Sequence, residues 1–263
     1  MGQISKDAML GFRDDLRQAR ANAYANSEGF QSILFVVERL GSALISKAGT
    51  LGSYKGKISK LVEPSAIACR IPSKPEFRFL FTPFYILYEL VSESRNDALH
   101  QGAYARHLTN HCVELSLILE DALTMTIEAA TVADFMIKNT IYAELWHPLA
   151  YVRQIMLANS FSYLPFRFSK NKSKDDEQFY LISDQDLAKV LRGSRSDRNN
   201  MLGMTLEKAI DESHIDLSPA KAILCSDCVE SIYKESDSKF FVVMRNLKDI
   251  NSAVGIVTPF DIL

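Results

Sequence analysis

The feature of this sequence that most constrains its fold is an internal repeat in its second half. Helical patterns and short β-rich runs alternate between about residues 128 and 193, and the same order returns between about 200 and 263. The polar segment 169–177 separates two strand-like runs, so we expect it to be the solvated loop of a β-hairpin. Segment 194–200 is rich in turn-forming and charged residues and is interpreted as a linker. A repeat of roughly 70 residues predicts two similar supersecondary units.

The first half has apolar residues at the three- and four-residue spacing of amphipathic helices. Helices are expected over residues 6–25, about 29–47, 84–94 and about 98–126, with at most a short helix between 50 and 76. Thr82 and Pro83 are predicted to start the helix at residue 84, which is apolar almost all round and is expected to be central. Short or irregular connections favour an antiparallel up-and-down bundle over residues 1–127.

The amino-acid composition indicates which broad class of protein this chain belongs to. The chain has 263 residues, of which 47% are hydrophobic and 24% are charged, as is typical of a soluble globular protein. A net charge of -2 excludes a global basic surface, so any contact with nucleic acid must be local. The absence of an apolar leader or an 18-residue apolar run predicts a cytoplasmic protein with no membrane span. Cys225 and Cys228 lack a second Cys or His pair, so no metal site is predicted.

One motif occurs in both copies of the repeat. Gly255-Ile256-Val257-Thr258-Pro259-Phe260-Asp261 contains glycine, two hydrophobic residues, a hydroxyl residue, two variable residues and aspartate. Leu181-Ile182-Ser183-Asp184-Gln185-Asp186 matches the same pattern, with Tyr180 in the place of glycine. With these motifs, residues 128–263 resemble a tandem pair of cystathionine-β-synthase (CBS) domains, about 128–193 and 200–263. The second copy lacks the helix that customarily follows its motif.

The resemblance implies that an adenine nucleotide, AMP, ADP or ATP, binds between the repeats as a regulatory ligand. An aspartate can accept two hydrogen bonds from a ribose diol, and a hydroxyl at a helix start can meet a phosphate. Asp186 and Asp261 are therefore assigned to the diol, and Ser183 and Thr258 to the phosphate. The second motif is preferred as the binding site because it fits the pattern fully. The alternative is that all four residues are ordinary helix caps.

A second motif lies between the two most apolar helical patterns of the first half. Arg95-Asn96-Asp97-Ala98-Leu99-His100 places an arginine and a histidine five positions apart, which suits chemistry on a phosphodiester. With this R-x4-H pattern, residues 1–127 resemble a HEPN domain, a helical bundle whose active members are metal-independent ribonucleases. Arg106 and His111 also match the spacing. The first match is preferred because it lies at a helix junction and carries the favoured asparagine, Asn96.

The reaction that this resemblance implies needs no catalytic cofactor, because the 2′-hydroxyl of RNA is the nucleophile. His100 is expected to act as acid or base and Arg95 to hold the phosphate. Asn96 is expected to position single-stranded RNA or to structure the turn. One copy of Arg95 and His100 offers a single histidine for two proton transfers. We therefore expect a homodimer in which two copies form one composite site.

Together these observations predict an α + α/β protein in which a HEPN-like bundle is followed by a tandem CBS pair. The preferred function is a ribonuclease regulated by an adenine nucleotide, which would suit stress response or phage defence. One alternative is a non-catalytic nucleotide-sensing adaptor whose bundle binds a protein, and another is a regulator that binds RNA without cleaving it. In the adaptor, Arg95 would be ion-paired at a helix end and His100 would be an ordinary surface residue.

Overall fold

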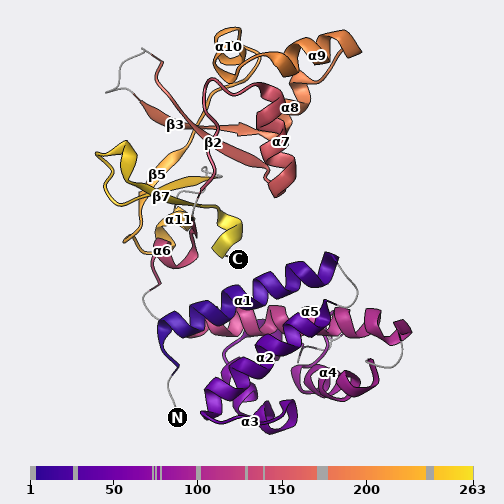
Figure 1. Cartoon of the computed structure of the whole chain (residues 1–263). Coiled ribbons are helices and arrows are strands. Elements are labelled where there is room, and N and C mark those ends of the chain that lie inside the picture. The colour runs from indigo at the N-terminus through magenta and orange to yellow at the C-terminus, as the bar shows by residue number, and fades with distance from the viewer. Residues whose placement is uncertain are drawn as a thin grey trace. The chain divides into compact units, whose positions relative to one another are not determined.

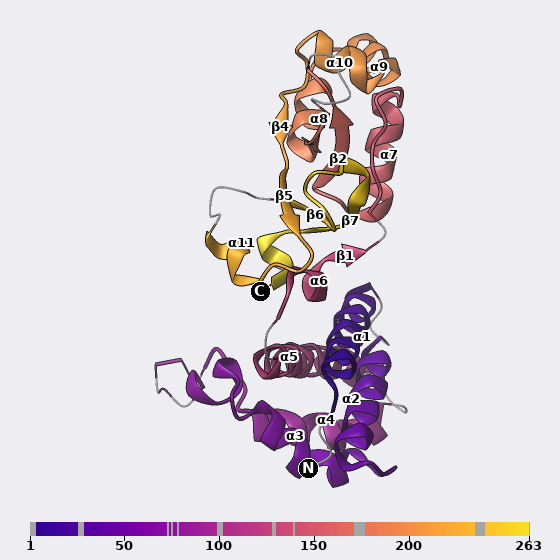
Figure 2. The same cartoon turned by 90° about the vertical axis from the view of Figure 1, so that its left-hand side faces the viewer.

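The computed structural model describes residues 4–25, 29–72, 74, 76–77, 79–98, 102–127, 130–138, 140–170, 177–234 and 240–262; the side chains of residues 66, 70, 94–98 and 102–107 are outside this description. The chain forms two compact units, Met1–Glu128 and Ala129–Leu263. In the described ranges the first unit is helical, and the second combines helices with β-sheets (Figures 1 and 2). None of the helices in these ranges has the length and apolar character needed to cross a bilayer.

The helical unit is organised around its last helix. Its elements are α1 (Lys6–Ala25), α2 (Phe30–Ile45), α3 (Leu51–Val62), the π-helical turn η1 (Ala66–Arg70), α4 (Phe84–Ala98) and α5 (Gly102–Thr126). Helix α5 packs against α1, α2, α3 and α4, so the prediction that the helix at residue 84 is central was wrong. Helix α4 buries Leu87, Tyr88 and Val91 but leaves Tyr85 60% exposed, so only one face of this apolar helix lies in the core.

Helix α3 is longer than the sequence predicted, and two local features explain it. Thr50 and Ser53 form a capping box that satisfies the first backbone N–H groups of the helix. Leu51, Tyr54, Ile58 and Val62 lie on one buried face. The Tyr54 ring packs directly on Gly41 of α2, where any Cβ would collide with it. These contacts offset the low helix propensity of the glycines in α3.

Helix α4 begins where the sequence predicted but continues a few residues further. The helix begins at Phe84, after Pro83, whose carbonyl accepts hydrogen bonds from the N–H groups of Ile86 and Leu87. The Thr82 hydroxyl donates to Glu114 of α5 at 3.0 Å, so the residue ties α4 to α5. The predicted ranges put Asn96 and Asp97 between two helices, but both residues lie inside α4, which continues to Ala98.

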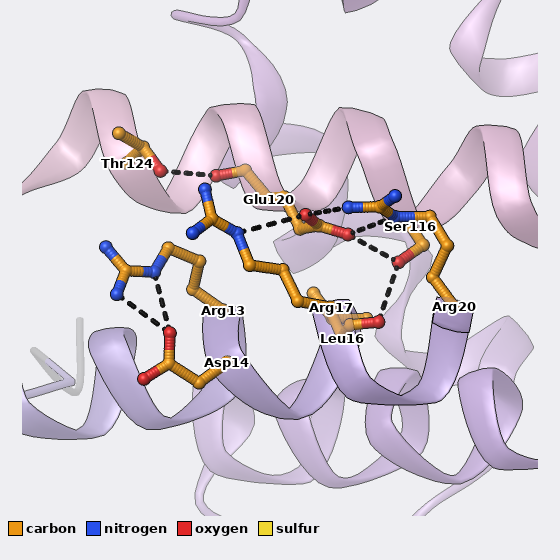
Figure 3. Close-up of polar contacts among 8 residues, drawn as sticks. All are labelled: Arg13, Asp14, Leu16, Arg17, Arg20, Ser116, Glu120 and Thr124. Atoms are coloured by element: carbon orange, nitrogen blue, oxygen red, sulfur yellow. Dashed lines mark hydrogen bonds and ion pairs between the residues drawn. The ribbon is translucent and has the colours of Figure 1, made fainter. Parts of the chain in front are cut away.

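A polar cluster joins α1 to α5 (Figure 3). The carboxylate of Glu120 is 8% exposed and accepts two hydrogen bonds of 2.9 Å from the Arg20 guanidinium. Arg17 approaches the same carboxylate at 3.4 Å, and the Ser116 hydroxyl donates to it at 3.0 Å. The hydrogen bond to Glu120 is the main cause that raises the pKa of Arg20 above its usual value. Every oxygen of this buried carboxylate therefore has a partner.

The second unit contains the two copies of the repeat. The elements of the first copy are α6 (Val132–Phe135), β1 (Ile137–Lys138), α7 (Leu149–Asn159), β2 (Tyr163–Phe168), β3 (Gln178–Ser183) and α8 (Asp184–Val190). After α9 (Arg195–Gly203), the second copy has α10 (Leu206–Asp211), β4 (Ser218–Pro219), β5 (Lys221–Leu224), α11 (Glu230–Lys234), β6 (Phe241–Met244), η3 (Ile250–Ser252), β7 (Ala253–Val257) and η4 (Pro259–Ile262). Strands β2 and β3 pair from Tyr163 to Phe168, so the expected hairpin forms.

The two sheets exchange strands between the copies. Strands β2, β3 and β4 form one sheet in that order, and β1, β7, β6 and β5 form the other. The short strand β1 of the first copy therefore pairs with the hairpin of the second, and β4 of the second copy pairs with the hairpin of the first. The two pairings have the same register, because Leu181 faces Ser218 just as Ile256 faces Ile137.

Side chains of alternate strand residues build separate cores, as the period of two in a strand requires. Tyr180 and Ile182 of β3 pack under α7, α8 and α10. Phe179 and Leu181 of the same strand point the other way and meet β6, so they form a core between the two sheets. A further core lies under α6 and α11 on the far side of β6.

The prediction of a linker at 194–200 was wrong, because these residues form the N-cap and the first turns of helix α9. Ser194 and Asp197 form a capping box, and the hydrogen bonds from Ser194 lower the pKa of the Asp197 carboxyl below its usual value. No residue described in α9 is buried. The helix therefore depends on its cap, which compensates for a sequence that lacks an apolar stripe.

Candidate functional site

The first repeat motif forms the start of α8. The Ser183 hydroxyl donates to Asp186 Oδ2 at 2.7 Å, and the Ser183 N–H donates to the same oxygen at 3.1 Å. In return, the Asp186 N–H donates to Ser183 Oγ at 3.1 Å. This reciprocal arrangement is a capping box. It occupies Asp186 Oδ2 and leaves Oδ1 with the Lys189 ammonium, at 3.4 Å.

The second motif has the same local geometry at the start of η4. The N–H of Thr258 donates to Asp261 Oδ2 at 2.7 Å, and its hydroxyl donates to that oxygen at 2.9 Å. The structure therefore shows both serine or threonine residues, and both aspartates, in capping roles. Their assignment to a nucleotide ligand stays a prediction.

Strand registers explain why the first motif departs from glycine. Tyr180 and Gly255 hold equivalent places in the two hairpins, since Tyr180 pairs with Phe166 and Gly255 with Val243. A Cβ at Gly255 would lie 2.7 Å from the carbonyl oxygen of Ile137, so the second hairpin requires glycine there. In the first hairpin the Tyr180 ring stacks on Phe166, with centroids 6.0 Å apart.

A cavity of about 540 Å³ lies beside the first motif. The first repeat contributes Tyr163, Leu181, Ser183, Gln185, Asp186 and Lys189 to its lining. The second repeat contributes Asp216, Ser218, Pro219 and Phe240. Two residues of the four predicted for the nucleotide, Ser183 and Asp186, are thus brought together at one cavity. Thr258 and Asp261 are not part of it, although the sequence favoured their motif.

One wall of the cavity is aromatic. The rings of Tyr163 and Phe240 lie with centroids 6.2 Å apart and an angle of 56° between their planes. Both belong to the core between the two sheets, so their positions are fixed by packing. Leu181 and Pro219 extend this apolar wall. A flat, uncharged ring system could pack against it.

The charged groups of the cavity are in contact with one another. The Lys189 ammonium is 3.4 Å from Asp186 Oδ1 and 3.3 Å from Asp216 Oδ2. The hydrogen bond with Asp216 is the largest cause that raises the pKa of Lys189, and the bond with Asp186 is the next. Asp186 is 10% exposed, whereas Asp216 is 82% exposed. Lys189 thus links a buried carboxylate to one at the surface.

Sequence reasoning missed Lys189, Asp216, Tyr163 and Phe240. A signal for Lys189 was present, because it lies one helical turn after Asp186 and residues three apart on a helix are neighbours. Asp216 lies outside the motif and reaches the cavity only through the pairing of β4 with β3. No local pattern marks it.

The residues predicted for RNA cleavage lie mostly beyond the described side chains. Arg95 and Asn96 belong to the last turns of α4, and their side chains are outside the description. His100 lies outside the described residues altogether. In the second R-x4-H match, His111 is half-buried in α5, and the side chain of Arg106 is not described.

The cysteine pair shows no metal site. In the described parts of the chain, no group of three or more His, Cys, Asp or Glu residues is placed to hold a metal ion. The exposed Cys228 thiol donates to Glu230 at 2.8 Å, and Cys225 packs partly into the core beneath α11.

Comparison with known proteins gives matches to solved structures. No protein-family model matches the chain, and no curated protein matches it. The protein CBSX2 in complex with AMP is 17% identical, with a TM-score of 0.35 over 50% of this chain and 92% of that chain. The CBS domain of a bacterial CNNM/CorC family Mg²⁺ transporter in complex with ATP is 17% identical, with a TM-score of 0.36 over 51% and 84%. A hexameric CBS-CP12 protein from bloom-forming cyanobacteria is 11% identical, with a TM-score of 0.36 over 51% and 71%.

Proposed function

We propose that the second unit is a sensor that binds an adenine nucleotide in the cavity beside Ser183 and Asp186. The observation that carries this proposal is the meeting of an aromatic wall, a buried carboxylate and an ammonium in one cavity of about 540 Å³. Volumes of this size are ordinary for small-molecule sites. The resemblance to CBS domains also assigns Ser183 and Asp186 to a nucleotide, although it favoured the second motif, with Thr258 and Asp261.

Each part of a nucleotide has a partner of suitable chemistry in this cavity. The purine base packs against Tyr163 and Phe240. The ribose hydroxyls donate to Asp186 Oδ1, because Oδ2 already accepts two hydrogen bonds from Ser183. The phosphate meets the Lys189 ammonium, which must then leave one of its carboxylate partners.

The test is titration calorimetry of the full chain with AMP, comparing the wild type with Asp186→Asn. The matched control is Asp197→Asn, because Asp197 forms a capping box with Ser194 at similar distances but lies in the exposed helix α9. We expect Asp186→Asn to weaken binding at least tenfold, on the order of one lost charged hydrogen bond. Asp197→Asn should bind as the wild type does.

Two outcomes would count against this assignment. If Asp186→Asn bound AMP as tightly as the wild type does, the ligand would not bind at the first motif. Loss of binding in Asp261→Asn instead would move it to the second motif, as the sequence alone suggested.

For the helical unit we propose a metal-independent ribonuclease activity, which rests on the R-x4-H pattern of Arg95 and His100. In this reaction the 2′-hydroxyl attacks the adjacent phosphate, the bond to the 5′-oxygen breaks, and a 2′,3′-cyclic phosphate forms. His100 exchanges the protons and Arg95 stabilises the phosphorane charge. Asn96 positions the RNA, and two copies of the chain supply the residues of one composite site.

The assay is cleavage of a 5′-labelled single-stranded RNA in EDTA, with and without AMP. His100→Ala should abolish cleavage, and His111→Ala, the histidine of the second R-x4-H match, should retain it. If His111→Ala alone removes activity, the second match is the site. If the wild type never cleaves, the helical unit is a binding module, and the adaptor becomes the better proposal.

A further inference from the structure

The charges that line the cavity are unbalanced. Its lining residues include two carboxylates, Asp186 and Asp216, and one ammonium, Lys189. Lys189 already contacts both carboxylates, at 3.4 and 3.3 Å. The described lining residues therefore have a formal charge of -1 before any ligand enters.

This excess of negative charge should make the affinity for a nucleotide depend on its number of phosphates. One phosphate group can replace a carboxylate as the partner of Lys189, so a monophosphate finds a cation. Among the lining residues that the structure describes, a second or third phosphate finds no further cation and comes close to Asp216. Like charges a few ångströms apart near a protein surface repel each other, so each added phosphate should weaken binding.

We infer that the cavity takes an adenosine ligand with at most one phosphate and rejects the di- and triphosphate, and that Asp216 is the residue that sets this limit. This inference rests on the proposed nucleotide site and specifies its ligand class. Asp216 suits the role because it is 82% exposed, at the solvent side of Lys189, where a chain of phosphates would emerge. Asp186, in contrast, is held inside by its capping bonds with Ser183.

The experiment is calorimetric titration of the full chain with adenosine, AMP, ADP and ATP in EDTA at one low ionic strength. EDTA is needed because a bound divalent cation would neutralise part of the phosphate charge. We expect AMP to bind roughly tenfold or more tightly than ATP, with ADP between them. Raising the salt concentration should reduce this ratio, since the repulsion acts near the surface.

The Asp216→Asn variant assigns the effect to one residue. Because Asp216 is exposed, the substitution should leave the fold intact, and it should bring the affinity for ATP to within about threefold of that for AMP. The control is Asp211→Asn, which removes an exposed carboxylate of α10 that does not line the cavity and should leave the ratio unchanged.

The outcomes separate the inference from the function on which it rests. If ATP binds as tightly as AMP, the phosphate limit is wrong although the nucleotide site stands. If the ratio survives in Asp216→Asn, the limit comes from another group. If none of the four compounds binds, the proposed nucleotide site itself is wrong.

Discussion

Glu120 and Asp186 have the same residue exposure, 7%, and the same charge, yet their surroundings differ. Glu120 lies between α1 and α5 with two arginines and a serine, so its cluster has more positive than negative charge. Asp186 shares a single lysine with a second carboxylate, and it borders a cavity. A carboxylate with more than one cation for a partner holds helices together, whereas one that shares a single cation with a second carboxylate beside a cavity is suited to a ligand.

Replacing Glu120 should have the largest effect on stability. Glu120→Gln leaves two arginines facing each other between α1 and α5, and breaking a buried ion pair usually costs 3 to 5 kcal/mol. Arg17 and Arg20 are 30% and 26% exposed, so water screens part of that loss and we expect about 2 to 4 kcal/mol. Chemical denaturation followed by circular dichroism measures it.

The control for this variant is Asp15→Asn, which breaks the exposed ion pair of 2.9 Å with Arg39. It should cost about 1 kcal/mol or less. Equal losses in the two variants would show that burial does not distinguish the Glu120 cluster from a surface pair.

A buried neutral group in the same helical unit should respond to alkaline pH. Burial raises the pKa of the Cys112 thiol to about 12, above the value of about 8.5 expected in an unfolded chain. The stabilisation is therefore complete below about pH 8.5 and is lost as the pH rises toward 12. By pH 10 the free energy of unfolding should fall by about 2 kcal/mol from this thiol.

Denaturation curves at pH 8 and pH 10 test this for the wild type, Cys112→Ala and Cys69→Ala. Cys69 is exposed, so its variant should keep the full pH dependence, while Cys112→Ala should lose the part due to the thiol. The same slope in all three proteins would refute the assignment to Cys112.

The smallest effect is expected from the two capping carboxylates of the second unit. Asp186→Asn weakens a capping box, so it should lower the free energy of unfolding by about 1 kcal/mol or less, and Asp197→Asn should lower it by no more than that variant does. Asp186→Asn is expected to lose the nucleotide and Asp197→Asn to keep it. A small loss of stability together with a lost ligand would distinguish Asp186 from Glu120, which stabilises the helical unit. A loss above about 3 kcal/mol in Asp186→Asn would make it a structural carboxylate like Glu120.

The sequence allowed prediction of elements whose signal is local. Helix α1 has the predicted limits, and the hairpin of β2 and β3 follows from two strand-like runs around a polar loop. Helix α9 was missed because its sequence has no apolar stripe, and the capping box at its start was not recognised. Ser183 and Asp186 were named from their motif. Asp216 reaches the cavity through the pairing of β4 with β3, and Phe240 reaches it through packing between the two sheets; no local pattern encodes either contact.

The exchange of β1 and β4 between the copies makes each copy depend on the other for a complete sheet. A single copy would contain a hairpin without its outer strand and a short strand without its sheet, and such unpaired edges invite association with another chain. Two identical copies could satisfy each other by swapping these strands about a two-fold axis. Because both copies belong to one polypeptide, each hairpin finds its outer strand within the same chain.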